Sequence, residues 1–113
     1  MEMEYRTSDM ELMVKASDLL NPKEYFQIRE SYRLRNPRKY VNADTHRRIM
    51  QEAIDTAKMI ISRKGTDEDI RNACLYLYIC MDARKYRLNH NKARRDLKID
   101  ELIQKYRNDI SSI

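Results

Sequence analysis

The chain holds one glycine and two prolines in 113 residues, and this scarcity restricts the folds that it can adopt. The tight turns between β-strands depend on glycine and proline, so a fold made of hairpins is disfavoured. Apolar residues instead recur at the spacing of a helix face, and no segment alternates polar and apolar residues for long enough to form a strand. The sequence therefore predicts an all-α fold, a compact bundle of about five helices that forms a single domain over residues 1–113.

Two helix starts are marked near the N-terminus. Ser8 and Glu11 have the spacing of a capping box, and an apolar stripe follows them. Asn21-Pro22 then supplies a cap and a first-turn proline for a second helix, which Asn36-Pro37 is expected to stop. We expect residues 1–7 to be a frayed acidic N-terminus.

The third helix is expected to begin at a cap on Asp44 or Thr45 and to end at Lys64. Gly65 follows directly and is well placed to be its C-terminal cap.

The fourth predicted helix spans about 67–88 and is apolar on all sides, which is typical of a buried helix at the centre of a bundle or in a dimer interface. A break at 89–91 separates it from the last helix, which carries an apolar face over 99–110.

The cysteines and the hydropathy pattern indicate a cellular compartment. Cys74 and Cys80 lie about 240° apart around one helix and cannot pair with each other, so a reducing environment is expected. The first four residues are acidic and polar, unlike a signal peptide, and the longest uncharged run, 73–81, is too short to span a bilayer. We expect a cytoplasmic protein, encoded by a cell or by a virus that acts in the cytoplasm.

Positive charge is concentrated in two blocks. Residues 29–48 contain seven Lys/Arg and two acids, and residues 84–98 contain seven Lys/Arg and one acid, whereas the first twenty residues are acidic. A solubilising surface normally mixes its signs, so this pattern, with a net charge of +5, predicts a polyanionic partner. The candidate nucleic-acid-binding residues are Arg33, Arg35, Arg38, Lys39, His46, Arg47, Arg48, Arg84, Lys85, Arg87, Lys92, Arg94 and Arg95.

The start of the third helix is the sharpest part of this prediction. With a cap on Asp44 or Thr45, Arg47 and Arg48 would lie at the positive end of the helix dipole, where cations are unfavourable. Backbone N–H groups and guanidinium groups there could hold a phosphate together, and a solvated surface is the alternative.

Two tyrosines lie among the bases of the first block. Tyr32 is expected to pack inward because it continues the inner face of its helix, whereas Tyr40 could either pack or stack on a base.

Catalytic groups are few. His46 and His90 are the only histidines, and there is no Cys/His cluster at zinc spacing and no glycine loop, so we expect no metal and no cofactor. Arg84 and His90 have an R-x5-H spacing that resembles the signature of HEPN-type ribonucleases, which are small helical domains that dimerise to form a composite site. That resemblance would imply an acid or base role for His90 and transition-state stabilisation by Arg84. It covers two residues, and we do not assign the family on it.

Two functions from different classes remain open. The first is a non-enzymatic nucleic-acid-binding or regulatory protein that contacts the phosphates of DNA or RNA. The second is a helical protein-interaction module, an inhibitor or adaptor, that docks on an acidic partner surface; the seven methionines would suit an adaptable contact. A homodimer is compatible with both.

Overall fold

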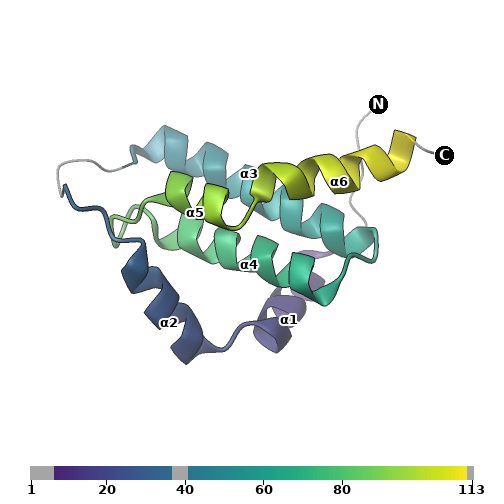
Figure 1. The fold of residues 1–113 in the computed structure, drawn as a ribbon, viewed down its shortest axis with the longest axis horizontal. Coiled ribbons are helices and arrows are strands. Elements are labelled where there is room, and N and C mark those ends of the chain that lie inside the picture. Colours follow the sequence, from purple (N-terminus) through teal and green to yellow (C-terminus); the bar gives the residue numbers. More distant parts are fainter. Residues whose placement is uncertain (1–6, 37–40, 112–113) are drawn as a thin grey trace.

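The computed structural model describes residues 7–36 and 41–111, and within these ranges it confirms the all-α prediction (Figure 1). A separate α5 precedes the last helix, so six helices are present where about five were predicted. The helices are α1 (Asp9–Leu19), α2 (Pro22–Ser31), α3 (Ala43–Ser62), α4 (Asp67–Asp82), α5 (His90–Asp96) and α6 (Ile99–Ser111).

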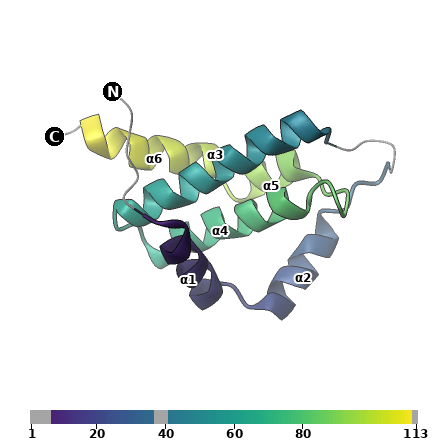
Figure 2. The same cartoon turned by 180° about the vertical axis from the view of Figure 1, so that it is seen from behind.

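The helices are arranged around an antiparallel pair formed by α3 and α4, which a short turn joins (Figures 1 and 2). α5 and α6 lie along one side of this pair, whereas α1 and α2 lie on the other side and diverge from each other. The described chain is elongated, with principal extents of 46 × 29 × 23 Å, and the described residues of the two basic blocks lie toward the end where α3 begins and α4 ends.

α4 is the central helix, as its all-round apolar pattern predicts. Half of its residues are buried, including Cys74, Tyr76, Ile79 and Cys80, each at most 1% exposed. Burial raises the pKa of the Cys74 thiol to about 11 and of the Cys80 thiol to about 12, so both behave as small apolar side chains.

Three helical segments end on a left-handed residue that is not glycine. Lys64, Arg87 and Lys98 all have φ 54°, so the chain with one glycine uses basic residues at its left-handed helix ends. The fourth helix was predicted to reach residue 88; its regular part ends at Asp82, and further turns lead to Arg87.

The predicted C-terminal cap at Gly65 is wrong by one residue. Lys64 takes the left-handed conformation after α3, and the N–H groups of Lys64 and Gly65 bond to the carbonyls of Ile61 (3.0 Å) and Ile60 (2.9 Å), as in a Schellman motif. Position 65 has no room for a side chain, because a Cβ there would overlap Ile60 and lie 2.8 Å from the Tyr106 hydroxyl. The turn therefore needs glycine because α6 packs against it.

Adjacent substitutions in this turn are expected to act in opposite directions. Lys64→Gly should raise the free energy of unfolding by about 0.5–1 kcal/mol, because relief of the left-handed strain exceeds the added freedom of the unfolded chain. Gly65→Ala should lower it by about 1–3 kcal/mol through overpacking against Ile60 and Tyr106. Urea denaturation of both variants measures the difference; if Gly65→Ala were the more stable of the two, α6 would not pack as described.

Other element boundaries also differ from prediction. α2 stops at Ser31, well before Asn36, because the backbone at Tyr32–Leu34 pairs with another segment. At the N-terminus, Thr7 was expected to be frayed but is 5% exposed, and its hydroxyl contacts the Lys58 carbonyl (3.2 Å) and the Ser62 hydroxyl (2.8 Å). The remaining residues of the predicted frayed segment, 1–6, lie outside the described part of the chain.

Candidate nucleic-acid interface

A short antiparallel bridge joins the two basic blocks. The Leu34 N–H donates to the Arg87 carbonyl (2.8 Å), and the Asn89 N–H donates to the Tyr32 carbonyl (2.7 Å), with Arg33 opposite Leu88. The segment after α2 is thereby held beside the segment after α4, although more than 50 residues separate them in sequence. Arg33 and Arg35 consequently lie at the same end of the molecule as Arg84, Lys85 and Arg87.

The start of α3 is fixed to this end by His46. Its Nε2 lies 3.0 Å from the Cys80 carbonyl and 3.3 Å from the Met81 carbonyl, so the ring donates to the C-terminal end of α4. This contact adds a side-chain donor at the end of α4, where the Cys80 carbonyl also accepts a longer bond from the Ala83 N–H (3.3 Å). Arg47 and Arg48, which follow His46 directly, are exposed on the first turns of α3.

The cap of α3 is Asn42 and neither Asp44 nor Thr45. The Asn42 side chain accepts a hydrogen bond from the Thr45 N–H (2.8 Å), and its carbonyl accepts one from the His46 N–H (2.9 Å). Asparagine is as good a cap as aspartate, so Asn42 was visible in the sequence as a competing cap. Arg47 thus lies beyond the first turn, where the helix dipole is weaker. Phosphate binding by the helix N-terminus itself loses support, because the Thr45 N–H already donates a hydrogen bond to the Asn42 side chain.

The exposed bases of this region are called the basic end. They surround the bridge, the start of α3 and the short helix α5, and they draw on both predicted blocks. The basic end consists of Arg33, Arg35, Arg47, Arg48, Arg84, Lys85, Arg87, Lys92 and Arg95. Arg38 and Lys39, also predicted to bind nucleic acid, and Tyr40 lie outside the described residues.

Two of these bases pair with acids close to them in sequence. Arg33 donates to both carboxylate oxygens of Glu30 (2.6 and 3.0 Å), and Arg47 lies 3.7 Å from Asp44. Both arginines remain more than half exposed, and such surface pairs contribute little to stability and can exchange for a phosphate.

The Arg94 side chain is bound by other side chains of the protein. Its guanidinium forms ion pairs with Glu52 of α3 and with Asp100 of α6 (2.5 Å), and it lies 3.5 Å from the Tyr76 hydroxyl. Burial alone would lower the pKa of Arg94. Its hydrogen bonds to Asp100, Glu52 and Tyr76 raise this pKa instead. Arg94 and His46, both predicted contacts, are engaged within the protein, and we leave them out of the basic end.

Arg94 also lines a polar cleft of about 670 Å³ between α3 and α6. Arg48 and Arg107 contribute positive charge to its wall, whereas Glu52, Asp55 and Asp100 contribute negative charge. This balance makes the cleft a poor site for a polyanion, and the basic end beside it is the more positive surface.

Tyr32 packs inward, as predicted. It is 8% exposed, its hydroxyl donates to Asp96 (2.9 Å), and the Lys92 ammonium lies 5.7 Å from its ring centroid. Burial, followed by the bond to Asp96, raises the pKa of Tyr32 to about 12. Tyr32 therefore connects the end of α2 to α5 and positions Lys92.

Arg84 and His90, the pair with ribonuclease-like spacing, differ in exposure. Arg84 is exposed in the turn after α4, whereas His90 is partly buried in the first turn of α5, which Asn89 caps. Burial lowers the pKa of His90, and the nearby charges of Arg94 and His46 lower it further. That the protein is not an enzyme, with a ribonuclease-like site at this pair as the remote alternative, stays a prediction.

The described parts of the chain contain neither a metal-binding cluster nor a membrane-spanning helix. No group of three or more His, Cys, Asp or Glu side chains there could hold a metal ion. None of the helices in these ranges is both long enough and apolar enough to cross a bilayer.

Comparison of the chain with protein-family models, with curated proteins and with solved structures found no match.

Proposed function

We propose that this protein binds nucleic acid, DNA or RNA, through contacts of the basic end with the phosphate backbone, and that it is a non-enzymatic binding or regulatory protein. The backbone bridge between Tyr32–Leu34 and Arg87–Asn89 is the observation that carries the proposal, because it brings both basic blocks to one end. A single basic surface can follow several consecutive phosphates, whereas two blocks on opposite faces could not.

The character of the surface favours backbone contacts over base recognition. Its side chains are Arg and Lys, which bind phosphate. The two described tyrosines among them are already engaged: Tyr32 is buried and donates to Asp96, and the ring of Tyr86 is in contact with Arg29 and Lys85. Affinity should therefore be mainly electrostatic and depend little on sequence.

Salt dependence is the test of this proposal. Binding of the protein to a fluorescein-labelled 20-base-pair DNA duplex, and to an RNA duplex of the same sequence, is measured by fluorescence anisotropy between 50 and 300 mM KCl. Neutralisation of about four to six phosphates predicts a slope of log K against log [KCl] of roughly −4 to −5 on DNA. A flat response, or no binding to either duplex at 50 mM KCl, would contradict the proposal.

Poly-glutamate of equal total charge is the control for an acidic protein partner. A surface suited to the regular phosphates of a duplex should bind poly-glutamate at least tenfold more weakly at the same salt concentration. Equal or tighter binding of poly-glutamate would instead support docking on an acidic protein.

A further inference from the structure

An apolar surface is exposed on α1, α2 and α4, and Met81 brings it up to the end of α4. The largest exposed apolar side chains of the described residues are Met10 (75%), Met13 (67%), Val14 (54%), Phe26 (52%) and Met81 (47%). Single exposed apolar residues are ordinary, but these five line three adjoining hollows on and between α1, α2 and α4.

α1 has two apolar faces. Leu12 and Ala16 point into the core and are at most 6% exposed, whereas Met10, Met13 and Val14, with Ser17 one turn on, form a second stripe that faces outward. This spacing of i, i+3, i+4 and i+7 is the one that a helix uses to pack against another helix. In the described protein, no helix covers the stripe.

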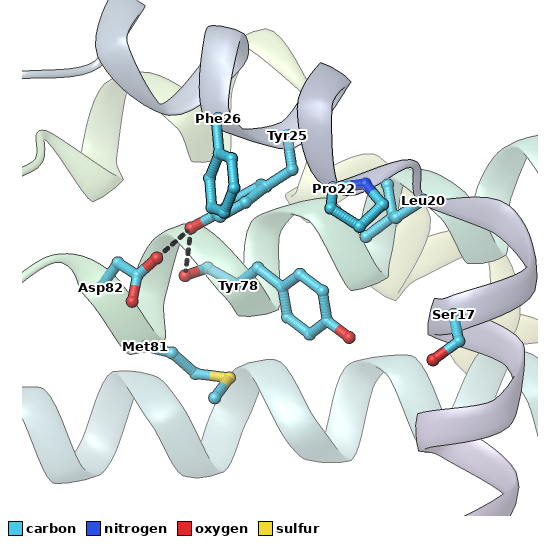
Figure 3. A pocket seen from close by; sticks show the side chains of 8 residues that line it. All are labelled: Ser17, Leu20, Pro22, Tyr25, Phe26, Tyr78, Met81 and Asp82. Carbon is cyan, nitrogen blue, oxygen red and sulfur yellow. Dashed lines mark hydrogen bonds between the residues drawn. The ribbon is translucent and has the colours of Figure 1, made fainter.

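The stripe continues into a groove between α1, α2 and α4. The groove has a volume of about 360 Å³, and Figure 3 shows its wall of Leu20, Pro22, Tyr25, Phe26, Tyr78 and Met81. The Tyr25 hydroxyl donates to Asp82 (2.6 Å) and to the Tyr78 carbonyl (2.9 Å), which ties α2 to α4 at the floor. A second hollow of about 370 Å³, lined in part by Met13, Tyr78 and Met81, joins the groove to the stripe. Together the stripe and the groove are called the α1–α4 groove.

The solvent edge of α1 beside this surface is acidic. Glu11 and Asp18 are exposed and seven residues apart, so they lie on the same edge of the helix, and Val14 is one turn from both. Lys15 is within one turn of both acids but farther round the helix from the stripe, so the edge keeps a net charge of −1, with the acids nearer to the stripe. Asp9 and Asp82 also line the surface, but Lys58 and Arg29 neutralise them in ion pairs.

This acidic edge argues against a second copy as the occupant. A two-fold interface through α1 would pair the helix with itself in antiparallel orientation, so the edge with Glu11 and Asp18 would face the same edge of the other copy. Like charges at such flanking positions disfavour pairing, and opposite charges select the partner.

We propose that the α1–α4 groove binds an amphipathic helix of another protein, whose apolar stripe packs against Met13, Val14 and Met81 and whose Lys or Arg residues face Glu11 and Asp18. The groove shares no residue with the basic end, although Met81 adjoins it, and the proposal does not depend on nucleic-acid binding. The protein would then join a basic helical partner to its polyanion-binding end.

The probe is a pair of labelled 18-residue helical peptides. Both carry leucine at i, i+3, i+4 and i+7 over the whole length, and their flanking edges carry lysine in one peptide and glutamate in the other. We expect the full-length protein to bind the lysine peptide at least tenfold more tightly by fluorescence anisotropy at 150 mM KCl. Met13→Gln with Val14→Gln, uncharged changes at exposed positions of α1, should reduce binding of the lysine peptide at least tenfold while leaving the circular dichroism spectrum and duplex binding unchanged.

Reversal of charge on α1 tests whether the edge with Glu11 and Asp18 selects the peptide. Glu11→Lys with Asp18→Lys should reverse the order of the two peptides, whereas Glu68→Lys with Glu101→Lys, which change net charge equally at exposed sites on α4 and α6, should leave the order unchanged. Equal binding of the two peptides by the parent, or reversal by the control pair as well, would overturn the proposal. It would also be overturned if analytical ultracentrifugation showed a dimer that Met13→Gln with Val14→Gln dissociates, since the groove would then be occupied by a second copy.

Discussion

Replacement of Leu77 by alanine is expected to lower the free energy of unfolding by about 2–5 kcal/mol, through the lost burial of the side chain and the cavity that remains. Leu77 is 4% exposed on the central helix and faces Leu12, Ala16 and Ile54, so both α1 and α3 lose packing. A domain of this size has a total stability of about 5–15 kcal/mol, and the variant should therefore approach the unfolding threshold at 37 °C.

Met81→Ala is the matched control for Leu77→Ala. It removes a side chain of similar size one turn further along α4, but Met81 is 47% exposed, so the expected loss is below about 1 kcal/mol. Urea denaturation with linear extrapolation compares the two variants at 25 °C. Similar losses for both would show that α4 is not the centre of the bundle.

Reversal of charge at the start of α3 is expected to separate binding from folding. Arg47→Glu with Arg48→Glu should weaken duplex binding at least tenfold, about 1.4 kcal/mol, because two positive charges of the basic end become negative. The stability change should stay within about 0.5 kcal/mol, because the pair with Asp44 is exposed and the Arg48 contact with Thr45 is long, at 3.4 Å. Fluorescence anisotropy and thermal melts measure the two quantities.

Lys15→Glu with Lys23→Glu is the control for this experiment, since it makes the same change in net charge at exposed sites on α1 and α2, outside the basic end. This pair should weaken binding much less, because charges more than a Debye length away are screened. A loss equal to that of the Arg47 and Arg48 variant would indicate a general effect of net charge and would remove the start of α3 from the interface.

A second pair of substitutions, in the basic block after α4, tests the interface independently. Arg84→Glu with Lys85→Glu should weaken binding as much as the α3 pair if both blocks form one surface. Loss with the α3 pair alone would mean that the block after α4 only complements the negative end of that helix, where basic residues are also favourable.

The sequence by itself determined the helical class and the starts of α1 and α2. Ser8 and Asn21 cap these helices as expected, since an N-cap is a hydrogen bond to a backbone N–H two or three residues away. Thr66 caps α4 in the same way. The central position of α4 was predictable for the same reason, because an apolar surface on every side of a helix can be buried only inside the bundle.

The ends of the helices were less predictable because contacts between helices decide them. Lys64 takes the left-handed position and Gly65 the crowded one because Tyr106 of α6 lies against the turn, 40 residues away in sequence. Likewise α2 ends early because the Tyr32 carbonyl bonds to the Asn89 N–H.

In the candidate site, too, some features follow from the sequence and others only from the tertiary structure. The number of bases and their two blocks are properties of the sequence, and they predicted the type of partner. Only the tertiary structure decided that the blocks meet, through Arg33 opposite Leu88, and that His46 and Arg94 are engaged within the bundle. A helix cap is satisfied within four residues, whereas pairing between segments more than 50 residues apart depends on how the helices pack, and no local pattern encodes that packing.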